Sequence, residues 1–286
     1  SLSRLEYRGY DSSGIATIFE DKILNLKAKG KLENLYEKLL TQSTPGNVGI
    51  GHTRWATHGG VSEENAHPHT SGRVSIVHNG IIENFEEIKN QLLKENRSFL
   101  SSTDSEVIAH LFDKELKNTS DLKIVTLNVL KQLQGAFAFV VLLLDYPDTL
   151  IAARQASPLA VGKGNNGCAV GSDAIALAGV ANELMFLEDG DFAIINRKKI
   201  TIYNNLGLEI NRQVIPNIIE ASSVGKGNYR HFMQKEIFEQ PETIAHSISG
   251  MYSSSGKPSK ELIELISTSP KSITILAAGT SHYAGM

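Results

Sequence analysis

The residues best suited to chemistry lie in one polar segment, His52-Thr53-Arg54-Trp55-Ala56-Thr57-His58-Gly59-Gly60. A short apolar run from Val48 precedes the segment, which predicts a strand that ends two residues before Arg54 and leads into a functional loop. The planar guanidinium of Arg54 can bind a carboxylate through two parallel hydrogen bonds, and the Trp55 ring can exclude water beside it. A salt-bridged loop next to a core tryptophan explains the same residues, so the segment alone leaves both interpretations open.

Two further polar segments border predicted elements. Asn79 and Gly80 come directly after the apolar run that starts at Val74, and they are also an ordinary turn signal. Thr103-Asp104-Ser105-Glu106 resembles a capping box, so that Asp104 can either face a ligand or cap the helix that follows. Neither segment is diagnostic by itself.

Histidines are concentrated around this segment. Five of the nine lie between His52 and His78, which raises the hypothesis of a metal site. No cysteine joins them and no carboxylate stands at a familiar ligand spacing, so we do not expect a metal. His67-Pro68-His69 is better suited to ordering a turn. Arg8 either supports the site from beneath or only pairs with Asp11.

The composition excludes several classes of function. The 286 residues are 41% hydrophobic and 21% charged, enough for one large globular domain or two smaller ones. The formal net charge of −3 provides no overall field that would attract nucleic acid or an anionic membrane. The longest apolar run, residues 136–144, is well short of the roughly 20 residues that a membrane span needs. A single cysteine, Cys168, indicates a reducing compartment, so we expect a soluble cytoplasmic protein.

Hydrophobic periodicity predicts the elements that must position these residues. Hairpins are expected at 14–19 with 23–28 and at 136–144 with 149–153, and helices at 1–9, 31–42, 83–96, 103–116 and 122–134. Short strands are expected near Leu159, Ala169, Leu184, Phe192 and Ile200. The pattern favours one or two antiparallel sheets with helices packed outside them. A chain that opens inside a short helix is expected to lack preceding sequence.

A second domain is expected after the polar, glycine-rich residues 219–230. Residues 229–249 are expected to be helical with an interruption at Pro241, and residues 273–278 form a buried strand that leads into Gly279-Thr280-Ser281-His282. A strand, a Gly-Thr-Ser turn and a helix N-terminus can bind an anion, although a helix cap without a ligand explains the pattern equally well.

Seven runs, spread in order over the whole chain, resemble the glutamine:fructose-6-phosphate amidotransferases, also called glucosamine-6-phosphate synthases. They read LEYRGYDSSG at 5–14, HTRWATHG at 52–59, NAHPH at 65–69, VHNGIIEN at 77–84, TD at 103–104, YRHFMQKEIFEQP at 229–241 and GTS at 279–281. The last two runs separate this family from other glutamine amidotransferases.

The resemblance implies an α/β (α+β) fold, a four-layer α/β/β/α N-terminal-nucleophile sandwich followed by the start of a doubly wound α/β sugar isomerase domain. Residues 1–220 would be the glutaminase domain without its N-terminal leader, 221–260 a linker and helical entry segment, and 261–286 the truncated start of the isomerase domain. The implied activity is the synthesis of glucosamine 6-phosphate from fructose 6-phosphate and glutamine. The family further implies a homodimer at full length and no metal or organic cofactor.

The resemblance also implies roles for individual residues. Arg54 would bind the α-carboxylate of glutamine and Asp104 its α-ammonium group. Further residues that would line this substrate site are Trp55, Thr57 and His58. The Asn79 side chain and the Gly80 N–H group would form the oxyanion hole, where each donor lowers the barrier by roughly 3 kcal/mol. Thr280 and Ser281 would bind the sugar phosphate.

One departure from the family concerns the nucleophile. These enzymes use a cysteine at the mature N-terminus, whose thiol attacks the amide of glutamine. This sequence has none there, and Cys168 lies in an apolar run typical of a small buried side chain. We therefore expect the 286 residues to be incomplete at both ends and inactive.

Two alternatives remain open. One is another N-terminal-nucleophile glutamine amidotransferase, for example one that acts on phosphoribosyl pyrophosphate, although the turn at Gly279 argues against the phosphoribosyltransferase domain it would need. The other is a non-catalytic homologue that binds a sugar phosphate.

Overall fold

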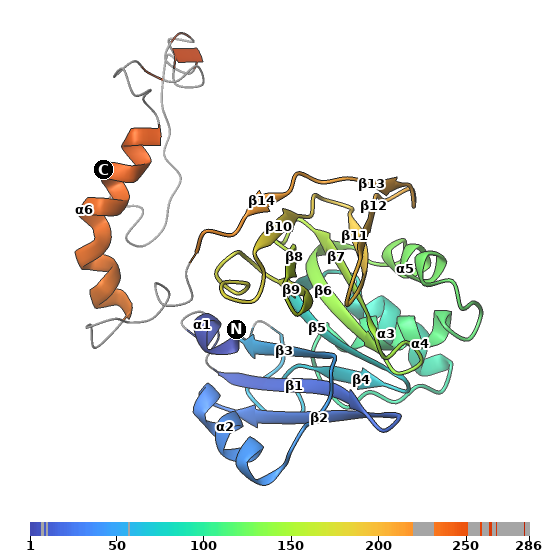
Figure 1. Cartoon of the computed structure of the whole chain (residues 1–286). Helices are drawn as coiled ribbons and strands as arrows, with labels where there is room; N and C mark the ends of the chain where they lie inside the picture. The colour runs from blue at the N-terminus through green and yellow to red at the C-terminus, as the bar shows by residue number, and fades with distance from the viewer. Residues whose placement is uncertain are drawn as a thin grey trace. The chain divides into compact units, whose positions relative to one another are not determined.

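The computed structural model describes residues 1–6, 9, 11–56, 58–219 and 232–250, together with Pro258, Ile263, Glu264, Ser267 and Tyr283. The chain divides into two compact units, residues 1–225 and residues 226–286 (Figure 1). Four residues with predicted roles, Arg8, Thr57, Thr280 and Ser281, lie outside the described residues, and so does the strand expected at 273–278.

The first unit contains both helices and strands. Its helices are α1 (Leu2–Leu5), α2 (Leu32–Thr41), α3 (Phe85–Lys94), α4 (Glu106–Glu115) and α5 (Leu122–Leu130). Its strands are β1 (Ser12–Phe19), β2 (Lys22–Lys29), β3 (Gly49–Arg54), β4 (His69–Ser71), β5 (Val74–Ile82), β6 (Gly135–Leu143), β7 (Thr149–Gln155), β8 (Ala160–Gly164), β9 (Gly167–Gly171), β10 (Glu183–Phe186), β11 (Phe192–Asn196), β12 (Ile200–Tyr203), β13 (Glu209–Ile210) and β14 (Ile215–Pro216).

A seven-stranded antiparallel sheet, ordered β13-β12-β11-β7-β6-β5-β4, forms the middle of this unit. Helices α3, α4 and α5 pack on one face of it (Figure 1), and their shared core includes Ile108, Phe112 and Phe139. Every residue of β6 from Phe137 to Leu143 is buried. Its sequence is a continuous apolar run because both faces of this strand are covered.

Two smaller sheets, ordered β2-β1-β3 and β14-β10-β8-β9, lie against the other face. Side chains from all three sheets form one core, which includes Ile50, Val77, Val161 and Ile195. Helix α2 covers the outer side of β1 and β2, where Leu32 and Leu35 pack on β2 residues (Figure 1). The expected four layers, α/β/β/α, are therefore confirmed.

Both hairpins and the helices within residues 31–134 are confirmed, but two boundaries near the site are not. Strand β3 continues as far as Arg54, which pairs with Ser12 of β1, so Arg54 ends the strand and does not follow it. Strand β5 continues through Asn79 and Gly80, which pair with Ala138 and Phe137 of β6. The ladder with a fully buried neighbouring strand outweighs the local turn preference of an Asn-Gly pair.

The second unit contributes helix α6 (Phe232–Gly250), which continues through Pro241 where an interruption was expected. Pro241 lacks an N–H group, but the loss of this one backbone donor does not end the helix. The Thr243 hydroxyl makes separate hydrogen bonds to the carbonyl oxygens of Glu239 and Gln240, at 3.1 Å each. Within the described part of the chain, none of the helices combines the length and the apolar character that a membrane crossing requires.

Candidate functional site

A cavity of about 1060 Å³ lies between the sheets of the first unit. Strands β1, β3, β5, β6 and β9 contribute to its walls. The predicted residues that line it are Arg54, Trp55, His58, Asn79, Gly80 and Asp104. The structure thus brings together all the predicted site residues that it describes, although they come from segments up to fifty positions apart.

Arg54 is 4% exposed and shapes the loop that follows it. Its guanidinium donates to the carbonyl oxygens of His58, Gly59 and Gly60 at 2.5 to 3.3 Å. Burial lowers the pKa of Arg54, and the negative charges of Asp11 and Asp104 oppose this shift. An arginine stays protonated under such shifts. Three carbonyls do not exhaust its five N–H donors, so this buried cation can still bind an anion.

The loop after Arg54 is held from two further sides. The Asp11 carboxylate accepts a hydrogen bond from the Ala56 N–H group. The His58 ring packs edge-on against Phe85, with ring centroids 5.6 Å apart. Trp55 is 60% exposed at the mouth of this loop. A side chain exposed to this extent does not belong to a core, so the core interpretation of Trp55 is wrong.

Asp104 is 3% exposed and faces strand β5. Its Oδ2 atom accepts a hydrogen bond from the Ile82 N–H group at 2.8 Å. The residue at the N-cap position of α4 is Ser105, whose side chain makes no capping hydrogen bond; its Oγ atom lies 2.8 Å from Nδ1 of His78. The predicted capping box is therefore wrong. Asp104 belongs to the cavity wall, because its carboxylate is anchored to the same strand that carries Asn79 and Gly80.

Asn79 and Gly80 stand where β5 borders the cavity. The Oδ1 atom of Asn79 lies 2.8 Å from Nε2 of His52, a residue of β3. Gly80 has φ +119°, and a Cβ atom built on it would lie 2.0 Å from the carbonyl oxygen of Ala136. Only glycine fits this backbone position.

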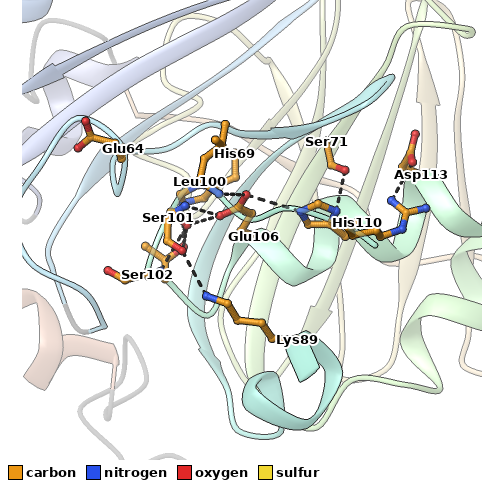
Figure 2. A network of polar contacts seen from close by, with 12 residues as sticks. Glu64, His69, Ser71, Lys89, Leu100, Ser101, Ser102, Glu106, His110 and Asp113 are labelled. Carbon is orange, nitrogen blue, oxygen red and sulfur yellow. Dashed lines mark hydrogen bonds and ion pairs between the residues drawn. The ribbon is translucent and has the colours of Figure 1, made fainter. Parts of the chain in front are cut away.

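Figure 2 shows the polar network around Glu106, which includes Leu100, Ser101 and Ser102 of the segment that precedes Asp104 in the sequence. The buried Glu106 carboxylate accepts hydrogen bonds from the Leu100 N–H at 2.9 Å, from the Ser101 N–H at 2.7 Å and from the Ser101 hydroxyl at 2.6 Å. Its Oε1 atom lies 3.6 Å from Nε2 of His110. Burial acts to raise the pKa of Glu106, but these hydrogen bonds outweigh it and hold the pKa at about 2. An ionised Glu106 thus fixes residues 100–101, just before Asp104.

Several histidines cluster at the wall of the cavity, where His67, His69 and His78 are buried and His52 is partly exposed. The ring centroid of His67 lies 4.3 Å from that of His52 and 4.6 Å from that of His69. Burial lowers the pKa of His69 to about 3 and that of His78 to about 4, and it holds the pKa of His67 well below the usual range. These low pKa values keep His67, His69 and His78 neutral at pH 7. Among the described residues, no three His, Cys, Asp or Glu side chains are placed to hold a metal.

Cys168 differs from its predicted environment. It is partly exposed in β9 and lines the cavity, so it is not a fully buried side chain. Burial nevertheless raises the pKa of its thiol, and Sγ lies 3.7 Å from the carbonyl oxygen of Arg197. A thiol with a raised pKa is a poor nucleophile, because the thiolate is the reactive form.

Sequence reasoning missed several residues of this site. His52 and Asn65 stood in the quoted motifs without a role, and Glu106 was interpreted as part of a capping box. The signal that could have identified them is their polar character next to apolar runs. A polar side chain that is buried there must find hydrogen-bonding partners.

Comparison with known proteins identifies a domain family and several relatives of this chain. Residues 52–179 match the family of glutamine amidotransferase domains. The chain is 46% identical over 286 residues to a glutamine–fructose-6-phosphate aminotransferase [isomerizing] of Zymomonas mobilis. This match covers 100% of the chain and 47% of the Zymomonas protein. The protein of the same name from Brucella abortus is 46% identical over 285 residues, with 99% and 47% covered. The chain spans about half the length of the curated relatives it matches.

A solved structure shares the fold. A glutamine phosphoribosylpyrophosphate amidotransferase from B. subtilis, complexed with ADP and GMP, is 28% identical with a TM-score of 0.61, and the match covers 71% of this chain and 45% of that one. Its fold is that of the N-terminal-nucleophile amidotransferases. The family match, the extent of the sequence identity and the shared fold agree. The chain is a homologue of the isomerizing glutamine–fructose-6-phosphate aminotransferases and carries a glutamine amidotransferase domain.

Proposed function

We propose that the cavity between the sheets binds glutamine, with Arg54 on the α-carboxylate and Asp104 on the α-ammonium group. A free amino acid carries both charges on one carbon, so its site needs a fixed cation and a fixed anion close together. The observation that supports this proposal is that both charged side chains are buried and line one cavity. Trp55, Thr57 and His58 complete the site on the loop that Arg54 organises.

The amide end of glutamine would lie toward β5 in this proposal. When a nucleophile attacks the amide, the carbonyl oxygen gains negative charge, and the Asn79 side chain and the Gly80 N–H group would stabilise it. Each such donor lowers the barrier by roughly 3 kcal/mol. The bond between Asn79 and His52 supports this role because it takes up the amide oxygen and leaves the amide NH₂ group available as a donor.

We further propose that residues 1–286 bind glutamine without hydrolysing it. The reaction needs a thiolate at the amide carbon, and the raised pKa of Cys168 makes this cysteine unsuitable. The test incubates the 286-residue chain with glutamine, measures binding by calorimetry and follows glutamate with a coupled assay. Saturable binding without glutamate release is expected. Steady glutamate release would contradict the proposal that these residues are inactive. Absence of binding would contradict the proposal that the cavity binds glutamine.

For the whole protein we propose the synthesis of glucosamine 6-phosphate from fructose 6-phosphate, with ammonia supplied by this domain. The names of the curated relatives support the proposal. In it, Thr280 and Ser281 bind the sugar phosphate, the full-length protein is a homodimer, and the location is cytoplasmic. The test supplies the full-length protein with both substrates and identifies the product by mass spectrometry. Glutamate release without glucosamine 6-phosphate would favour another amidotransferase.

A further inference from the structure

One buried side chain connects the two loops of the proposed site. Asn65 is 7% exposed, and each polar atom of its amide is used. Its Oδ1 atom accepts hydrogen bonds from the Ser102 N–H group at 2.9 Å and from the Ser102 hydroxyl at 3.2 Å. Its Nδ2 atom donates to the carbonyl oxygen of Gly60 at 2.9 Å and to Oγ of Ser102 at 3.0 Å.

The two partners of Asn65 belong to different halves of the site. Gly60 is one of the three carbonyl residues wrapped around the Arg54 guanidinium. Ser102 lies two positions before Asp104, in the loop that Glu106 anchors through Ser101 (Figure 2). The Asn65 amide therefore fixes the loop of the cation directly to the loop of the anion.

The junction leaves little space for adjustment. Gly59 has φ +77°, and a Cβ atom added to it would lie 2.9 Å from Nδ2 of Asn65 and 2.7 Å from Oγ of Ser102. Because the loops touch through Asn65 and Ser102, a change in this amide must shift one loop relative to the other. The hydrogen bonds that hold each loop separately would remain: those from Arg54 to the loop that follows it, and those from residues 100–101 to Glu106.

We propose that Asn65 is a positioning residue that sets the separation between Arg54 and Asp104, and thereby makes the site selective for ligands that carry both α-groups. The inference rests on the proposed glutamine site. It predicts a specific pattern: loss of Asn65 weakens ligands that need both loops at once, while ligands that need only one loop keep their affinity.

Two ligands separate these cases. Glutamine carries both α-groups, whereas 4-carbamoylbutanoate is glutamine without its α-amino group and can bind only through Arg54. Binding of each to the 286-residue chain is measured by ligand-detected NMR, which covers millimolar dissociation constants. The variant Asn65→Ala removes the whole connection. Asn65→Asp keeps the acceptor for Ser102, loses the donor to Gly60, and is nearly isosteric, so it remains informative if Asn65→Ala fails to fold.

For both variants we expect the dissociation constant of glutamine to rise roughly tenfold, while that of 4-carbamoylbutanoate changes less than about twofold. Asn128→Ala is the matched control, because the Asn128 amide binds Glu115 outside the cavity; it should leave both constants unchanged. If the variants weaken both ligands equally, or neither, the positioning role is overturned. If the unaltered chain does not bind glutamine, the proposed function fails instead.

Discussion

The Nε2 atom of His52 lies 2.8 Å from the Oδ1 atom of Asn79, so a side chain of β3 orients an amide of β5 at the wall of the cavity. An amide oxygen can only accept, which means that Nε2 of His52 carries the proton. This arrangement directs the Asn79 NH₂ group away from His52. The hydrogen bond explains how the Asn79 side chain, on a strand that borders the cavity, can be held in one orientation.

His52→Phe should therefore slow glutamine hydrolysis by the full-length enzyme. The substitution retains an aromatic ring but removes the hydrogen-bond donor to Asn79. The side-chain amide of Asn79 can then rotate and exchange the positions of its oxygen and its NH₂ group. Because an oxyanion exists only in the transition state, kcat should fall by about tenfold or more while KM changes little. Steady-state glutaminase kinetics measure this. His52→Gln, which can again donate to Asn79, should recover part of kcat, and a rise in KM at unchanged kcat would contradict the proposed role.

Asp104→Asn should separate ligand binding from folding. An asparagine oxygen can still accept the Ile82 N–H bond, so the melting temperature should change little. The negative charge that would face the α-ammonium group in the proposed site is lost, and the affinity for glutamine should fall about a hundredfold. Calorimetry with glutamine and thermal denaturation test the two halves of this prediction. An unchanged affinity would remove Asp104 from the proposed site.

Acid should destabilise the first unit through its buried neutral histidines. In the unfolded chain a histidine binds a proton near pH 6.5, whereas the folded pKa is about 3 for His69 and about 4 for His78. Between these values the unfolded state binds more protons. The free energy of unfolding should thus decrease as the pH is lowered from about 6.5, by up to about 1.4 kcal/mol per pH unit for each histidine.

Urea denaturation at several pH values between about 7 and about 4.5 measures this slope. The Thr103 hydroxyl lies 3.1 Å from Nε2 of His69. His69→Gln keeps a hydrogen-bonding partner for Thr103 but cannot be protonated, so its slope should be shallower than that of the unaltered chain. An identical slope would show that His69 does not contribute. Glu106 adds a further loss only below about pH 4.5, since it is the unfolded state that takes up its proton there.

Gly80→Ala should destabilise the fold by about 3 kcal/mol or more. The added methyl group would overlap the carbonyl oxygen of Ala136, and a φ of +119° is strained for alanine. Gly60→Ala is the matched control, because a Cβ atom there meets nothing within 4 Å. Urea denaturation of both variants should show a large loss for the first and almost none for the second.

Patterns of apolar residues predicted the layers of the fold, since strands such as β6 and helices such as α3 bury a face that is visible in the sequence. The same reasoning failed at Asp104 and Asn79. Local rules left a helix cap open for Asp104 and a turn open for Asn79, because these rules consider only neighbours in the chain. The actual partners, Ile82 for Asp104 and His52 for Asn79, are more than twenty positions away. Only the family resemblance connected these residues before the structure did.

The three carbonyl oxygens around Arg54 have a practical consequence for engineering. One guanidinium both shapes its loop and, in the proposed site, receives the ligand, so any replacement of Arg54 would alter two properties at once. Attempts to change ligand preference should therefore begin with side chains such as Trp55 and His58, whose replacement leaves that backbone scaffold in place.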